Sequence, residues 1–408
     1  MTTNDQPLGE QYVKLALAIE QHLPGYVDSY FGPEEWMIQA KEAGKPLLQE
    51  LTRKAVQLAT DLSQANGLDP QRKDFLTWQV NAMQMSLRLL AGEKISLAEE
   101  AQGLYNIQPK WKDESNFEEA HKEWDHALPA GGSLSDRLQA WRRALEMPVE
   151  KVQAILPIII NKLRALTRQR FGLPEGENFS VQFVSDKPWG AYNWYLGRYQ
   201  SRIDFNTDLP IKVSALADLI AHEGYPGHHT ELCIKEQKLI RERQFQEHSL
   251  TLLNSPSCVI AEGIATSALE TVLTDAEREE WYREEILPQA GMAHIDSKRM
   301  IQISRASQKL DGLVGNAAFM LHDQNKGEAE IIQYLQKYGL MTEKEAQKSI
   351  RFISDGIDRS YIFTYHMGYD LLAELFAQGN RDREAYFRRL LEEPVTPHQI
   401  REWIKDQD

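Results

Sequence analysis

The residues best suited to chemistry lie in one short segment, 217–231, which reads ADLIAHEGYPGHHTE. It contains three of the chain's eleven histidines, His222, His228 and His229, and a glutamate, Glu223, directly after the first. Imidazole and carboxylate groups are common zinc ligands in proteins, and a glutamate beside such a site can act as a general base. Their concentration around a Pro-Gly pair favours a metal site over a merely structural polar cluster.

A helix must carry the first histidine of this segment to the site. Apolar residues recur at helical spacing before it, at Val213, Leu216, Ala217, Ile220 and Ala221. This pattern predicts a buried helix that delivers His222 and Glu223 to one place.

The helix cannot continue straight if a second histidine is to reach the same ion. In a straight helix His229 lies about 10 Å beyond His222, and His228 lies about 120° out of phase with it. Pro226 removes a helical N–H group and Gly227 tolerates conformations closed to other residues, so the backbone is expected to leave the helix there. We expect His228 to be the second ligand because it needs the smaller distortion, and His229 to orient a ligand or the substrate.

A third ligand has to come from another element, because a catalytic zinc takes three protein ligands and keeps one position open. Glu262 is the best candidate. It lies in an apolar helix expected at 258–273, where an unpaired carboxylate would be costly. Gly263 beside it is expected to allow close approach of the metal-binding helix. Glu231 and Glu270 are the alternatives.

The segment His222–His229, HEGYPGHH, resembles a bacterial family of zincin-like proteins of unassigned function that is marked by the motif HExxPGHH. The family's EGW-type segment corresponds to Glu262-Gly263-Ile264, with isoleucine in place of tryptophan, and its C-terminal YxxG motif to Tyr365–Gly368. The run Gly25–Pro33, GYVDSYFGP, is similar to the family's N-terminal signature. The family's second glutamate, seven residues after the first, falls here on Leu269, with Glu270 one step later.

The resemblance implies a mainly α fold, related to the all-helical zinc peptidases. It also implies that a tyrosine from a C-terminal helix donates a hydrogen bond to the oxyanion of the reaction. Tyr365 is the first candidate for this role, followed by Tyr361 and His366.

These residues predict a zinc-dependent hydrolase, and most directly a metallopeptidase that acts on short peptides. Glu223 would be the general base that takes a proton from a metal-activated water and passes it to the leaving amine. Two alternatives stay open. The chain is a metal- or peptide-binding protein with a structural zinc, whose fourth position is filled by a side chain such as His229, or an amidohydrolase acting on non-peptide amides. The metal itself is open among divalent ions, since His and Glu sites accept several.

Helical patterning dominates the rest of the chain. One β region lies just before segment 217–231, which contains the candidate metal ligands and is called the metal segment. Residues 180–184 and 192–205 are rich in β-branched and aromatic residues and predict two or three antiparallel strands. By resemblance to zincin-type peptidases, Tyr192–Tyr199 is expected to form part of the substrate wall, with Asn193 and Arg198 contacting a peptide. We expect a single domain, 1–408; a helical subdomain 1–175 followed by a metal-site region 176–408 is the alternative division.

The charge and hydropathy of the sequence limit the classes of partner and the location that we expect. The net charge of −14 and the pI of about 5.4 argue against nucleic acid and against an anionic membrane surface. The start of the sequence lacks a basic and an apolar signal region, and no apolar run approaches the roughly eighteen residues of a membrane span. A cytoplasmic location is therefore expected, whereas the oligomeric state cannot be read from the sequence.

Overall fold

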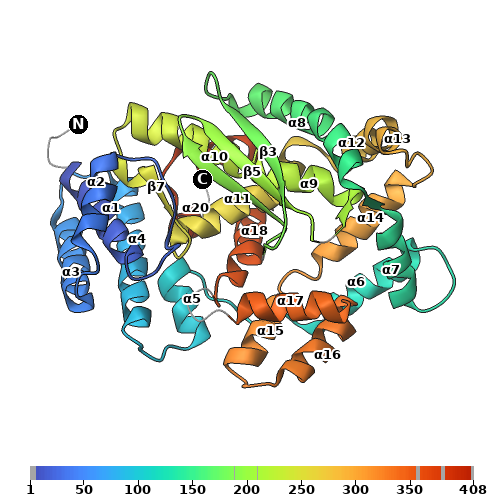
Figure 1. Ribbon diagram of the computed structural model, residues 1–408, viewed down its shortest axis with the longest axis horizontal. Helices are drawn as coiled ribbons and strands as arrows, with labels where there is room; N and C mark the ends of the chain where they lie inside the picture. The colour runs from blue at the N-terminus through green and yellow to red at the C-terminus, as the bar shows by residue number, and fades with distance from the viewer. Residues whose placement is uncertain (1–5, 188, 209, 355–358, 378–381, 406–408) are drawn as a thin grey trace.

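The computed structural model of the chain describes residues 6–187, 189–208, 210–354, 359–377 and 382–405. Helices make up 67% of it, which confirms the mainly α fold class. A small sheet lies near the middle of the molecule, with the N-terminal helices on one side of it and the later helices behind and below (Figure 1).

The N-terminal part of the chain folds into α1 (Gln6–Glu20), α2 (Glu34–Ala43), α3 (Leu48–Gln64) and α4 (Pro70–Leu90). α3 is amphipathic because its buried residues recur every three or four positions, at Leu51, Ala55, Leu58 and Leu62. The start of α4 is fixed by the Asp69 carboxylate, which accepts a hydrogen bond from the backbone N–H of Arg72 at 2.9 Å. These helices share an apolar core with Leu250 and Leu252, two residues from the other side of the metal segment.

The next helices are α5 (Leu97–Tyr105), α6 (Glu114–Ala127), α7 (Leu134–Ala144) and α8 (Val149–Phe171). Side chains of Ser96, Asp113 and Ser133 cap the first three of these helices at their N-termini. α8 packs against α9 (Val213–Glu223), and buried apolar residues between Trp124 and Phe171 belong to the same apolar core as the sheet and that helix.

The three-stranded sheet contains β3 (Asn178–Val184), β4 (Ala191–Gly197) and β5 (Gln200–Asn206), in the order β3-β5-β4. β4 and β5 form the expected antiparallel pair, joined by a tight turn at Arg198 and Tyr199, whose φ angles are 55° and 61°. β3, however, runs parallel to β5, so the sheet is mixed rather than wholly antiparallel. The reason is that β5 inserts between β3 and β4, while the short loop 185–190 crosses the end of β5.

The metal segment follows as α9 (Val213–Glu223) and α10 (His228–Lys235), which continues through a π-helical turn, η1 (Glu236–Glu242), and a 3₁₀ turn, η2 (Gln246–Ser249). Two short antiparallel ribbons tie this region to distant parts of the chain. β1 (Val27–Tyr30) pairs with β7 (Leu250–Leu252), and β2 (Glu146–Met147) pairs with β6 (Ile211–Lys212). The first of these ribbons attaches the N-terminal helices to the side of the metal segment.

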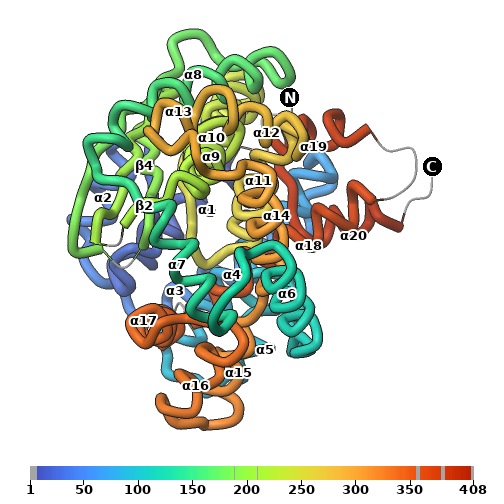
Figure 2. Tube along the Cα trace, turned by 90° about the vertical axis from the view of Figure 1, so that its right-hand side faces the viewer, coloured from blue at the N-terminus to red at the C-terminus, as the bar shows by residue number. Residues whose placement is uncertain are grey.

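The long helix α11 (Pro256–Val272) lies at the centre of the second half and packs against α9, α10 and α18 (Ile362–Ala377). The other elements are α12 (Asp275–Trp281), η3 (Tyr282–Ile286), α13 (Leu287–Ala290), α14 (Ser297–Gln308), α15 (Leu313–His322), α16 (Glu328–Gly339), α17 (Glu343–Ile353), α19 (Arg383–Glu392) and α20 (Pro397–Lys405). α19 and α20 lie on the same side of the molecule as α11 and α18, whereas α15, α16 and α17 form a separate group at its lower end (Figure 2).

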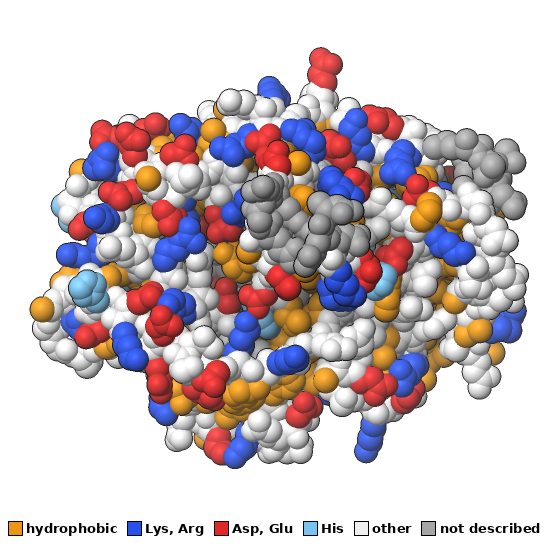
Figure 3. All heavy atoms as spheres, turned by 180° about the vertical axis from the view of Figure 1, so that it is seen from behind, with side chains coloured by type: hydrophobic (Ala, Val, Ile, Leu, Met, Phe, Trp, Pro, Cys, Tyr) orange, Lys and Arg blue, Asp and Glu red, His pale blue; other side chains and the backbone are white. Residues whose placement is uncertain are grey.

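Within the described part of the chain, no single helix has the length and apolar character of a membrane span; one bent pair, Pro256–Val272 with Asp275–Ala290, passes by length and composition alone. Most of α11 is buried in the protein core, which accounts for its apolar composition. On the face opposite to that of Figure 1, acidic and basic side chains are interspersed rather than separated into fields of one sign (Figure 3).

Candidate metal centre

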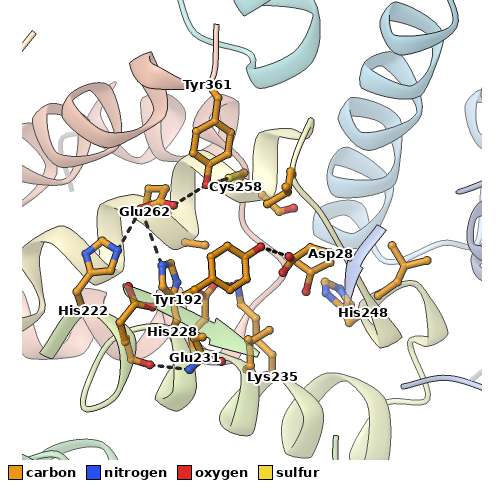
Figure 4. A pocket seen from close by; sticks show the side chains of 18 of the residues that line it. Asp28, Tyr192, His222, His228, Glu231, Lys235, His248, Cys258, Glu262 and Tyr361 are labelled. Carbon is orange, nitrogen blue, oxygen red and sulfur yellow. Dashed lines mark hydrogen bonds and ion pairs between the residues drawn. The ribbon is translucent and has the colours of Figure 1, made fainter. Parts of the chain in front are cut away.

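The break between α9 and α10 brings the first and second histidines of the motif side by side. α9 ends at Glu223, and the backbone N–H of Gly227 bonds the carbonyl of Ala221 at 2.8 Å, a wider loop than a helical turn. The Tyr225–Pro226 peptide bond within this loop is cis. As a result the rings of His222 and His228 lie with their centroids 4.8 Å apart and nearly perpendicular, at 87° (Figure 4).

Glycine is required at position 227 for this geometry. A Cβ placed there would lie 2.0 Å from the carbonyl oxygen of His222 and 2.4 Å from that of Ala221. Both atoms belong to the backbone and cannot rotate away, as the end of a flexible side chain could. The Pro-Gly pair thus has the function expected from the sequence: it allows the chain to fold back closely over the end of α9.

Glu262 of α11 faces the two imidazoles from the opposite side. Its Oε2 lies 3.4 Å from Nε2 of His222 and 3.9 Å from Nε2 of His228, and one ligand atom from each residue falls within 4.8 Å of the others. The ligands of a tetrahedral zinc lie about 3.3 Å apart when each is about 2.0–2.1 Å from the metal. The structure thus brings together the three side chains expected to be ligands, at separations close to those of a zinc site.

The two carboxylate oxygens of Glu262 differ in their hydrogen bonding. Oε1 accepts a hydrogen bond from the Tyr361 hydroxyl at 2.7 Å, whereas Oε2 is buried and has no hydrogen-bond donor. A buried carboxylate oxygen without a donor is costly unless a positive charge faces it. The donor set, two imidazoles and a carboxylate, is one that suits zinc.

The charges of the cluster are complementary. Burial alone would raise the pKa of Glu262, but the neighbouring imidazoles of His222 and His228 hold it below its ordinary value. Burial would lower the pKa of His222, but Glu262 and Glu223 more than compensate, so that it is raised. Burial also raises the pKa of Glu223, against the opposing effect of both histidines. The carboxylates therefore provide a negative environment, which favours the protonated form of His222 and would also stabilise a bound cation.

Glu223 is held at the end of α9 by the sheet. The Asn193 side-chain amide, on the edge strand β4, donates a hydrogen bond to the Glu223 backbone carbonyl at 2.6 Å. The Glu223 side chain is 6% exposed and lines the same cavity as the ligand residues. A base in this position has access to whatever small molecule enters the cavity.

The cavity has a volume of about 300 Å³ and is lined by parts of the chain that are distant in sequence (Figure 4). α10 contributes one helical face, with His228, Glu231, Leu232 and Lys235, and the N-terminal region contributes Tyr12, Asp28, Phe31 and Phe75. This volume lies at the lower end of the range for small-molecule sites, about 300–1,000 Å³. The cavity therefore fits a small ligand better than a folded protein.

Tyr361 and Tyr365 reach the site because α11 and α18 cross in close contact. A Cβ at Gly263 would lie 2.8 Å from the carbonyl of Gly368, and a Cβ at Gly368 would lie 2.4 Å from the carbonyl of Val259. Gly263 therefore allows the approach of α18, not of the metal-binding helix as expected from the sequence. Both tyrosines line the cavity, with ring centroids 5.5 Å apart.

Other expected residues lie elsewhere. His229 is fully buried behind the site, where its imidazole contacts Ser201 at 2.8 Å and Glu177 at 3.3 Å. His229 is therefore not directed at the ligands or the substrate; it helps to attach the start of α10 to the sheet. Arg198 is exposed in the turn between β4 and β5, outside the cavity lining.

The rival acidic residues and the third oxyanion candidate have other partners. Glu231 lines the cavity but pairs with Lys235 at 2.5 Å. Glu270 pairs with Arg383 at 2.6 Å, away from the site. His366 is buried beside Phe363 and is not part of the cavity lining.

Sequence reasoning did not identify Asp28, Lys235, His248 and Cys258 as members of the cavity. A signal existed for the first, because Asp28 belongs to the aromatic run Gly25–Pro33 that was noted as distinctive. For Lys235 and Cys258, helical spacing from an identified residue was the available clue, whereas His248, in the 3₁₀ turn η2, offered none. Lys235 lies seven positions after His228 on α10, and Cys258 lies four positions before Glu262 on α11.

Comparison with known proteins shows a similar fold in a solved structure but assigns the chain to no family. No protein-family model matches the chain, and no curated protein matches it. The crystal structure of a putative lipoprotein from Colwellia psychrerythraea is similar over 91% of this chain and 72% of its own, with a TM-score of 0.53 and 14% sequence identity. A putative lipoprotein of unknown function from Shewanella oneidensis is similar over 91% and 76%, with a TM-score of 0.48 and 10% identity. At these identities the first likeness concerns the fold alone.

Proposed function

We propose that the chain is a zincin-like, zinc-dependent metallopeptidase that acts on short peptides. The observation that carries the proposal is the convergence of His222, His228 and Glu262 at the wall of a cavity that also holds Glu223. The carboxylate oxygen of Glu262 that lacks a donor supports a cation at this point. The likeness to the HExxPGHH family, stated above from the sequence, agrees with this assignment.

In the proposed site His222, His228 and Glu262 hold the zinc. Zinc bound there would supply Lewis-acid chemistry, polarising a carbonyl and making water a better acid. Glu223 accepts the proton of the attacking water and delivers it to the leaving amine, and burial raises its pKa above the ordinary value of a glutamate, which suits a general base. Tyr361 orients Glu262 through its hydroxyl, which favours Tyr365 as the donor to the developing oxyanion.

A catalytic zinc is favoured over a structural one by the position of His229. A structural zinc needs a fourth protein ligand. His229, the expected candidate, is turned towards Glu177 and Ser201, and the cavity opens directly onto the ligand residues. Hydrolysis of a non-peptide amide would use the same residues, so substrate profiling separates it from peptide hydrolysis.

The proposal is tested by incubating the zinc-loaded protein with a library of short peptides, with and without o-phenanthroline. We expect cleavage that the chelator abolishes and that Glu223→Gln reduces by about 10²–10⁴-fold. Glu42→Gln, an exposed glutamate outside the cavity, is the matched control and should keep full activity. Cleavage that survives both the chelator and Glu223→Gln would remove the metal and the base from the mechanism. We still predict that the protein has no nucleic-acid or membrane partner. We also still predict that it is located in the cytoplasm.

A further inference from the structure

The wall of the cavity that belongs to the N-terminal region carries a carboxylate without a cationic partner. Asp28 of β1 lines the cavity and accepts a hydrogen bond from the Tyr192 hydroxyl of β4 (Figure 4). Within the described residues, no Lys, Arg or His nitrogen lies within 4.0 Å of Asp28. A partly buried carboxylate of this kind carries a desolvation cost that one neutral donor only partly offsets.

The other carboxylates of the cavity are already matched. Glu231 pairs with Lys235 at 2.5 Å, and Glu247 pairs with Arg72 through two contacts of 2.5 and 2.9 Å. Glu223 and Glu262 belong to the proposed catalytic centre. Asp28 is thus the cavity carboxylate left for a group that comes from outside.

The electrostatic environment of Asp28 agrees with this. Burial raises the pKa of Asp28 above its ordinary value, and the hydrogen bond from Tyr192 and the nearby His228 imidazole oppose the rise only in part. A cation on the ligand would favour the charged form of Asp28. The aromatic rings of Phe31, Trp189 and Tyr192 also line the cavity, and such rings attract cations.

We infer that the cavity selects substrates that carry a positively charged amine, which binds the Asp28 carboxylate. This inference deepens the proposed function and rests on it. The ammonium has two sources in a peptide, the free N-terminus and a lysine side chain. A free N-terminus held at Asp28 would make the protein an exopeptidase that reads the amino end of short peptides.

Binding can be measured without turnover by calorimetry on the zinc-loaded Glu223→Gln variant. The probes are Ala-Ala-Ala, N-acetyl-Ala-Ala-Ala and N-acetyl-Ala-Ala-Lys. We expect a probe with an ammonium to bind about 10- to 100-fold more tightly than N-acetyl-Ala-Ala-Ala, which has none; this is the usual contribution of a charged hydrogen bond. Tight binding of the first probe alone identifies the N-terminus as the source, and tight binding of the lysine probe identifies the side chain.

Asp28→Asn, added to the same background, tests the residue. Asparagine keeps an oxygen for the Tyr192 hydroxyl and loses only the charge, so the fold should be retained and the preference for an amine should disappear. Asp323→Asn, at an exposed position outside the cavity, is the matched control. Tyr192→Phe keeps the charge of Asp28 and should keep the preference for an amine, which covers the case in which Asp28→Asn fails to fold.

Equal binding of acetylated and free peptides, or a preference that survives Asp28→Asn, would overturn the inference. Failure of the proposed function would give another result. Amine-selective binding without hydrolysis by the wild-type protein would refute catalysis but support the Asp28 site. Hydrolysis with no preference for an amine would support catalysis but refute the Asp28 site.

Discussion

Replacing Gly227 with alanine should separate the two imidazoles of the proposed zinc site. The new Cβ would lie 2.0 Å from the His222 carbonyl oxygen, whereas carbon and oxygen atoms in contact settle at about 3.3 Å or more. The backbone must therefore shift by about 1 Å at the junction of α9 and α10. Metal ligands have to keep their distances within about 0.2 Å, so a shift of this size removes one ligand from the ion.

The magnitude can be worked out from the length of the chain. Zinc at 100 times its dissociation constant stabilises a native protein by about 2.7 kcal/mol. Unfolding entropy of about 2.1 cal/mol/K per residue gives about 0.9 kcal/mol/K for 408 residues, so zinc should raise the Tm by about 3 °C. If Gly227→Ala weakens binding 100-fold, the same zinc concentration should raise the Tm of the variant by only about 0.5 °C.

Differential scanning calorimetry in zinc and in chelator, with competition against a chromophoric chelator for the dissociation constant, measures both quantities. Gly327→Ala is the control, because a Cβ at that position meets no atom within 4 Å and the residue lies at the start of α16, away from the cavity. An unchanged zinc-dependent shift in Gly227→Ala would refute the reasoning about the turn. A wild-type protein that shows no shift would refute the metal site itself.

Three further results are expected. Tyr361→Phe removes the hydroxyl that bonds Glu262 at 2.7 Å, and should weaken zinc binding by about 10- to 100-fold in the same competition assay; unchanged affinity would exclude an orienting role. Burial lowers the pKa of His366 to about 4, below its value of about 6.5 in the unfolded chain, so the neutral form is the one that folding favours. The associated stability, up to about 3 kcal/mol, should be present above pH 6.5 and lost as the pH falls towards 4; chemical denaturation across this range should give a flatter profile for His366→Gln. Glu247→Ala leaves Arg72 buried without its partner and should cost about 3–5 kcal/mol of unfolding free energy, and a loss under 1 kcal/mol would contradict the importance of this pair.

Helix periodicity and the conformational preferences of proline and glycine were enough to predict helices and the geometry of the motif. The helix expected at 258–273 is found as Pro256–Val272. The phase argument that ranked His228 above His229 agrees with the structure, because helix periodicity and the break at Pro226-Gly227 are both local properties. Whether these residues bind zinc stays a prediction.

Contacts between distant segments were beyond the same reasoning. The parallel pairing of β3 with β5 depends on which strand inserts between the others, and strand propensity says nothing about this. The hydrogen bond from Tyr192 to Asp28 joins residues 164 positions apart, and no local pattern at either residue predicts that they pair. Similarly, Tyr361 and Tyr365 are one helical turn apart, so periodicity alone could not decide which of them reaches Glu262.

The ribbon of β1 and β7 has a consequence for how the protein is made. The hydroxyls of Ser29 and Thr251 bond across it at 3.0 Å although they lie 222 positions apart. At a synthesis rate of about 5–20 residues per second, β1 waits roughly 10–40 s on the ribosome before its partner strand exists. Its unpaired edge is exposed to other chains throughout this interval, which makes early chaperone binding valuable. Glu262 and Tyr365 are synthesised later still. A half-synthesised chain therefore lacks residues that the proposed metal site requires.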